Sequence, residues 1–136
     1  MIDEFIAWFK DRFGGDISHL KDFLIISGEK RIRMISPESR EINGAIRGIY
    51  IAKITPFGFS LSIEGSQILG KYARKNVVNL SKEVALMWMK GEDIPLRDHS
   101  MEKGTVMVKY KWVFMGSGYF DGQKVRNYVP GERRLE

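Results

Sequence analysis

The sequence of 136 residues contains no cysteine, and this absence excludes several kinds of chemistry. Without thiols the residues can form no disulfide, no thiolate metal site and no cysteine nucleophile. The lack of disulfides is consistent with a cytoplasmic location. Histidine is also scarce, and His19 and His99 lie far apart without the spacing of metal ligands. The sequence therefore predicts no metal centre.

Long apolar stretches and cofactor-binding loops are missing as well. The longest apolar run covers residues 84–89, which is far too short to cross a bilayer, and the N-terminus is acidic where a signal peptide would be basic. Gly116, Gly118 and Gly122 superficially resemble a nucleotide loop, but they fall between expected strands and not before a helix. We therefore expect a soluble intracellular protein with no membrane partner and no cofactor.

What is present is typical of a folded protein with a basic surface. Hydrophobic residues make up 43% of the chain and charged residues 29%, a balance that separates it from disordered sequences. The 3 Trp, 5 Tyr and 8 Phe residues provide material for a core. A formal net charge of +5 favours polyanionic partners, nucleic acid among them, without identifying one.

Local patterns predict a mixed N-terminal part over residues 1–75. Apolar residues at helical spacing indicate a helix over 3–13. Runs at 23–26 and 31–35 flank Gly28 and predict a β-hairpin, and two further strands at 48–54 and 59–62 flank the turn at 56–58. Ser62 is a plausible N-cap for a short helix that follows.

Strands dominate the predicted C-terminal part, residues 76–136. A short strand is followed by a helix that Ser81 caps and Gly91 ends. Strands then follow at 104–110 and 112–118, and Asp121-Gly122 marks a tight hairpin turn. This order predicts a small, closed or nearly closed β-barrel with the helix over one end. The expected fold class is α+β, with the N-terminal part packed on the barrel.

Several of these motifs, taken in order, resemble a known RNA-binding family. The strand, the capped helix ending in Lys90-Gly91-Glu92-Asp93, and the strand leading to Gly116-Ser117-Gly118 are similar to a PUA domain. The closing stretch at 125–135 resembles the end of the PUA-like domain found in Sun/Nop-type rRNA cytosine-C5 methyltransferases and in stand-alone archaeal relatives. The resemblance extends from Arg47 to Arg134, and it implies binding to structured RNA.

The activity of those methyltransferases does not carry over to these residues. Methylation at C5 of cytosine requires a cysteine that adds to the pyrimidine ring, and the sequence has neither this nucleophile nor a loop for S-adenosylmethionine. We therefore expect a non-catalytic RNA-binding protein, acting on rRNA or tRNA in ribosome biogenesis or RNA modification. A possible further partner is an RNA-modifying enzyme or a ribosome-assembly factor. The alternative is a protein-interaction module of a ribosome-assembly or RNA-methyltransferase complex.

The candidate RNA-binding residues are cations, together with one glycine and one amide, that we expect on a common face. Arg guanidinium groups bind phosphates in a bidentate manner, and Asn can read a base edge. Each residue also has a structural alternative: a solvated helix end for the first cluster, a helix-ending glycine, and a turn-capping Asn. Tyr110 and Trp112 are further candidates for stacking on bases. The candidate set is Lys71, Arg74, Lys75, Lys90, Gly91, Arg126, Asn127, Arg133 and Arg134.

Overall fold

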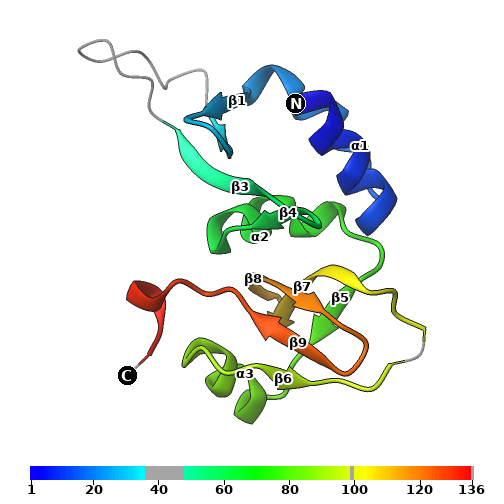
Figure 1. Ribbon diagram of the computed structural model, residues 1–136, viewed down its shortest axis with the longest axis vertical. Coiled ribbons are helices and arrows are strands. Elements are labelled where there is room, and N and C mark those ends of the chain that lie inside the picture. Colours follow the sequence, from blue (N-terminus) through cyan, green and yellow to red (C-terminus); the bar gives the residue numbers. More distant parts are fainter. Residues whose placement is uncertain (36–47, 99, 136) are drawn as a thin grey trace.

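The computed structural model describes residues 1–35, 48–98 and 100–135 (Figure 1). The chain begins with helix α1 (Ile2–Phe13), close to the expected bounds. Phe5, Phe9 and Phe13 of this helix are fully buried, so its apolar stripe forms core. The helix ends at Gly14, whose positive φ of 82° allows its N–H to bond the carbonyl of Lys10.

The N-terminal sheet is antiparallel and follows the order β1-β2-β3-β4. After a 3-10 turn, η1 (Ser18–Phe23), its strands are β1 (Leu24–Ser27), β2 (Arg31–Met34), β3 (Ile49–Thr55) and β4 (Gly58–Leu61). Helix α1 packs on one face, where the rings of Phe5 and Phe59 meet with centroids 5.1 Å apart. The two hairpins that the sequence predicted are thus confirmed.

A short helix, α2 (Ile63–Leu69), joins the N-terminal sheet to the rest of the chain. Ser62 caps it as expected, because its Oγ accepts a hydrogen bond from the N–H of Gly65 at 2.9 Å. Gly65 lies inside the helix because it packs against the backbone of Ile51, where a side chain would collide with the carbonyl. The turn η2 (Gly70–Tyr72) and strand β5 (Val77–Asn79) follow.

The C-terminal part is a curled half-barrel with strand order β5-β7-β8-β9-β6 (Figure 1). Its elements are α3 (Lys82–Met89), β6 (Ile94–Pro95), β7 (Gly104–Tyr110), β8 (Val113–Phe120), β9 (Lys124–Asn127) and the turn η3 (Gly131–Arg133). Strand β5 runs parallel to β7, and the other pairs are antiparallel. The expected α+β class with a PUA-like barrel is confirmed, and within the described residues the edge strands of this half-barrel are β5 and β6.

The two parts are joined by polar contacts as well as by apolar packing. Arg12 of α1 is buried, and its guanidinium donates to the carbonyls of Thr105, Lys103 and Glu102 at 2.5, 3.2 and 2.7 Å. The hydroxyl of Ser117 accepts from the N–H of Leu61 at 2.8 Å and donates to its carbonyl at 2.9 Å. These contacts hold the N-terminal part on the half-barrel. The domain boundary near residue 75 stays a prediction.

Candidate nucleic-acid interface

The first group of candidate cations lies on η2 and on the connection that leads from it to β5. Lys71, Arg74 and Lys75 are exposed, and none of the ion pairs among the described residues involves them. The backbone beneath them is fixed, because the Arg74 N–H donates to the carbonyl of Phe13 at 2.6 Å and the Asn76 amide donates to that of Arg12 at 2.6 Å. The Arg74 guanidinium also donates to the carbonyl of Lys71 at 3.1 Å, so a fixed backbone carries cations that have no carboxylate partner among the described residues.

The end of helix α3 holds the second group, and here Asn127 has a structural place. Its Nδ2 donates to the carbonyls of Trp88 at 2.8 Å and Glu92 at 3.0 Å, and its Oδ1 accepts from the Val129 N–H at 2.7 Å. The Asn127 N–H in turn donates to the Asp93 carboxylate at 2.8 Å. Both atoms of the Asn127 amide are therefore occupied, and the side chain fastens the C-terminal segment to the end of the helix.

Gly91, a candidate RNA-binding residue, is covered by the side chain of another part of the chain. The backbone at Gly91 has a φ of 90°, as a glycine that ends a helix can adopt. The side chain of Arg134 lies directly over it, where a Cβ would collide with the guanidinium stem. Arg134 Nε also donates to the carbonyl of Val129 at 3.0 Å. Gly91 therefore accommodates Arg134, while Lys90 beside it is exposed.

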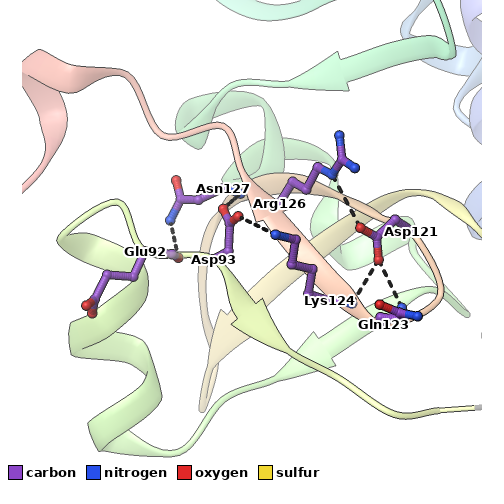
Figure 2. A network of polar contacts seen from close by, with 7 residues as sticks. All are labelled: Glu92, Asp93, Asp121, Gln123, Lys124, Arg126 and Asn127. Carbon is purple, nitrogen blue, oxygen red and sulfur yellow. Dashed lines mark hydrogen bonds and ion pairs between the residues drawn. The ribbon is translucent and has the colours of Figure 1, made fainter.

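Arg126 belongs to a network around the turn between β8 and β9 (Figure 2). Its Nε lies 3.3 Å from the Asp121 carboxylate, which also accepts from the backbone N–H groups of Gln123 and Lys124 at 2.9 Å each. These backbone bonds, followed by the contact with Arg126, lower the pKa of Asp121. The Lys124 ammonium forms a separate ion pair with Asp93 at 3.4 Å.

Arg133 is paired across the molecule with Glu64 of α2, at 2.8 Å. Partial burial raises the pKa of Glu64, but the hydrogen bond and the charge of Arg133 outweigh that effect and lower the pKa overall. The ion pair holds the C-terminal turn η3 against the N-terminal part. Arg133 is thus already partnered, unlike the cations before β5.

The expectation that all nine residues share a common face stays a prediction, and the fold distributes them over several elements. The connection from η2 to β5 runs along the opposite side of the molecule from the C-terminal segment (Figure 1). Lys71, Arg74 and Lys75 form one group, and Lys90, Gly91, Asn127 and Arg134 meet near the end of α3. The remaining two, Arg126 and Arg133, are paired with Asp121 and Glu64. As RNA contacts all nine stay predictions.

A further basic surface was not predicted from the sequence. A groove of about 880 Å³ runs between the N-terminal sheet and the C-terminal segment, and its lining includes Lys30, Arg31 and Lys53. The Tyr50 ring also lines it, with the Arg31 guanidinium carbon 4.8 Å from the ring centroid. Burial raises the pKa of Tyr50, and Arg31 partly opposes that shift. The alternation Arg31-Ile32-Arg33 indicates that one face of this strand is polar. Only the fold shows that the C-terminal segment lies across the groove from Arg31.

Comparison with known proteins confirms the resemblance of the C-terminal part. Residues 75–135 match the family described as "Methyltransferase RsmF PUA domain". The chain is similar to "Ribosomal RNA small subunit methyltransferase F" of Shewanella woodyi, with 28% identity over 134 residues. It is also similar to the protein of the same name from Vibrio atlanticus, with 32% identity over 98 residues.

These alignments cover different shares of the proteins compared. They include 96% and 72% of this chain but only 27% and 20% of the two relatives, so the chain spans about a quarter of their length or less. The relatives are bacterial, and the expected likeness to archaeal proteins is therefore not supported. Within the described residues, no helix is both long and apolar enough to span a membrane.

Proposed function

We propose that this chain is an RNA-binding module that acts on ribosomal RNA in RNA modification, in the cytoplasm, without catalysing methyl transfer itself. The observation that carries the proposal is the match of residues 75–135 to the PUA domain of an rRNA methyltransferase. The similarity to such enzymes extends over 134 residues and thus includes the N-terminal part. A net charge of +5 supplies the attraction to a polyanion.

The proposed primary contact is the group Lys71, Arg74 and Lys75. Exposed cations without a carboxylate partner gain most from meeting phosphate, because no existing ion pair has to be broken. Arg126 and Arg133 differ in this respect, since each is paired with an acidic side chain. We therefore expect the largest electrostatic contribution from the connection between η2 and β5, with Lys90 adding to it.

The test is a double charge reversal, Arg74→Glu with Lys75→Glu, measured by fluorescence anisotropy with a folded rRNA fragment at several salt concentrations. The removal of two phosphate contacts should reduce the slope of log K against log salt by about 1.4–1.8. The control reverses Lys10 and Lys82, which are also exposed cations, on α1 and α3. A folded Arg74/Lys75 variant that binds like the parent, with an unchanged slope, would refute this surface.

The proposed lack of catalysis has a separate test. The sequence contains no cysteine, so it cannot supply the nucleophile that attack on the cytosine ring requires. Calorimetric titration of the chain with S-adenosylmethionine should give no saturable binding, and a tritium-transfer assay on total rRNA should give no labelled product. Stoichiometric cofactor binding would contradict the proposal.

A second candidate function, a protein-interaction module, is favoured by an apolar surface. A cleft of about 300 Å³ beside α3 is lined by Met89, Tyr110 and Val113, among others. At the turn that follows Tyr110, Trp112 is 81% exposed. Exposed aromatic side chains of this kind serve either RNA stacking or protein contacts. The variant Trp112→Ala should weaken RNA binding in the first case, whereas unchanged RNA affinity would favour the protein-interaction function.

A further inference from the structure

We propose that the groove between the N-terminal sheet and the C-terminal segment binds single-stranded RNA, as a second site distinct from the Arg74/Lys75 surface. The proposal rests on the RNA-binding function above and extends it to an N-terminal surface. The groove, of about 880 Å³, lies between Arg31, Tyr50 and Lys53 on one wall and residues 128–133 on the other. This volume is within the range of roughly 300–1,000 Å³ found for sites that enclose small organic groups.

The first observation is an unbalanced pair of like charges. Arg31 on β2 and Lys53 on β3 are direct cross-strand partners in the antiparallel sheet, and Lys30 precedes Arg31. Like charges placed directly opposite each other destabilise a sheet. Among the described residues, none of the ion pairs involves these three cations. An anion lying along the groove would remove the repulsion, and a phosphate backbone supplies such charges at regular intervals.

The second observation is that aromatic surface accompanies the cations. Phe57, at the turn between β3 and β4, is 63% exposed, and Tyr128 on the opposite wall is 43% exposed. The Phe57 ring packs against the ring of Tyr119, with centroids 4.8 Å apart. An exposed ring beside cations is the arrangement on which unpaired bases stack. Because the faces of bases inside a duplex are covered by their stacked neighbours, this chemistry selects a single strand over a duplex.

The acidic residues of the groove do not cancel this attraction. Glu64 and Glu132 also line it, but Glu64 is already paired with Arg133 at 2.8 Å. That pair holds the C-terminal segment in place as a wall. Three unpaired cations therefore face one unpaired carboxylate, Glu132, within the described residues. The groove carries a net positive charge for an incoming strand.

The test uses the whole chain and a fluorescein-labelled oligouridine, which has no stable secondary structure. The variant Lys30→Gln with Lys53→Gln should reduce the slope of log K against log salt by about 1.4, because it removes two phosphate contacts to a single strand. Phe57→Ala should weaken binding of the oligouridine by about fivefold or more, because the base stacked on the ring has no replacement partner. The control Lys10→Gln removes one charge from α1, on the other face of the sheet, and should leave stacking intact.

A second readout does not depend on RNA. Because Lys53→Gln removes the like-charge opposition to Arg31, it should raise the melting temperature of the free protein while weakening the oligouridine complex. A variant that is less stable than the parent would contradict the charge argument. A polyglutamate peptide of equal charge should displace the oligouridine only weakly; equal displacement would show a groove that selects an acidic protein segment.

The outcome also separates this site from the proposed function. If the groove variants bind oligouridine like the parent while Arg74→Glu with Lys75→Glu weakens binding of folded rRNA, the groove proposal is overturned and the proposed function stands. If the parent binds neither RNA, both fail. Loss of oligouridine binding in the groove variants, with folded rRNA still held through Arg74 and Lys75, supports a second site.

Discussion

Replacement of Asn127 by alanine tests whether this residue organises the candidate interface or reads a base. The Asn127 amide makes three hydrogen bonds, to the carbonyls of Trp88 and Glu92 and from the N–H of Val129, at 2.7–3.0 Å. Each such bond contributes a net of about 0.5–1.5 kcal/mol. The loss of all three should lower the free energy of unfolding by about 2–4 kcal/mol, a large share of the roughly 5–15 kcal/mol typical of a domain.

The assay is urea unfolding followed by circular dichroism. With a slope of about 2 kcal/mol per molar, the middle of the usual range for urea, this loss should move the midpoint down by about 1–2 M. The control is Asn127→Asp, which keeps the acceptor for Val129 but loses both donors and points a carboxylate at the carbonyls of Trp88 and Glu92. At neutral pH it should be at least as unstable as the alanine variant.

RNA binding gives the result that would refute this reasoning. If Asn127 acts by position, the folded fraction of Asn127→Ala should lose affinity to a similar degree for all RNA sequences. A variant with the stability of the parent but a changed preference among RNA sequences would show that Asn127 contacts a base. The amide would then have to leave its contacts with Trp88 and Glu92.

Three further substitutions probe other contacts. Arg12→Met removes three bonds to carbonyls of the β7 end and should reduce the free energy of unfolding by at least about 3 kcal/mol in thermal or urea unfolding, with Arg12→Lys restoring only part. Gly91 has a φ of 90°, so Gly91→Ala should lower the free energy of unfolding by about 1–2 kcal/mol. The backbone strain should persist when Arg134→Ala removes the side chain above it. An unchanged melting temperature of Gly91→Ala in that background would contradict the strain argument. The folded pKa of Asp121 is depressed, so its stabilising effect is present above the unfolded pKa of about 3.9 and lost as the pH falls through the lower folded value. The stability gap between the parent and Asp121→Asn should therefore close on acidification, as denaturation from pH 7 to 2.5 would show.

The parts of the fold that the sequence predicted well depend on short-range interactions. Ser62 and Ser81 each accept a hydrogen bond from an N–H three residues later, so their capping is visible in the local sequence. Asp121-Gly122 produces a hairpin for two local reasons. The Asp121 carboxylate accepts hydrogen bonds from the N–H groups of Gln123 and Lys124, and Gly122 adopts a φ of 99°. None of these features requires knowledge of a distant residue.

The contacts around the candidate site could not be predicted from the sequence, because they join residues far apart in the chain. Arg133 pairs with Glu64, 69 positions away, and Asn127 contacts the end of α3 some 35–39 positions earlier. The sequence indicates that Gly91 ends a helix, yet only the fold identifies Arg134 as the side chain that lies over it. Composition and spacing reveal a cation but not whether a carboxylate already neutralises it.

The difference between partnered and unpartnered cations bears directly on where RNA would be held. The C-terminal segment is fastened at several points: Arg133 to Glu64, Arg134 to the Val129 carbonyl, and the Leu135 N–H to the Met89 carbonyl at 2.8 Å. The side chains of Arg133 and Arg134 are thus already engaged in fixing the position of the segment. An RNA phosphate that recruited Arg133 would have to replace an existing ion pair, which reduces the net gain. Among the described residues, no ion pair would have to be replaced at Arg74, Lys75, Lys30 or Lys53. The electrostatic part of RNA affinity should therefore depend on these four cations more than on the arginines of the C-terminal segment.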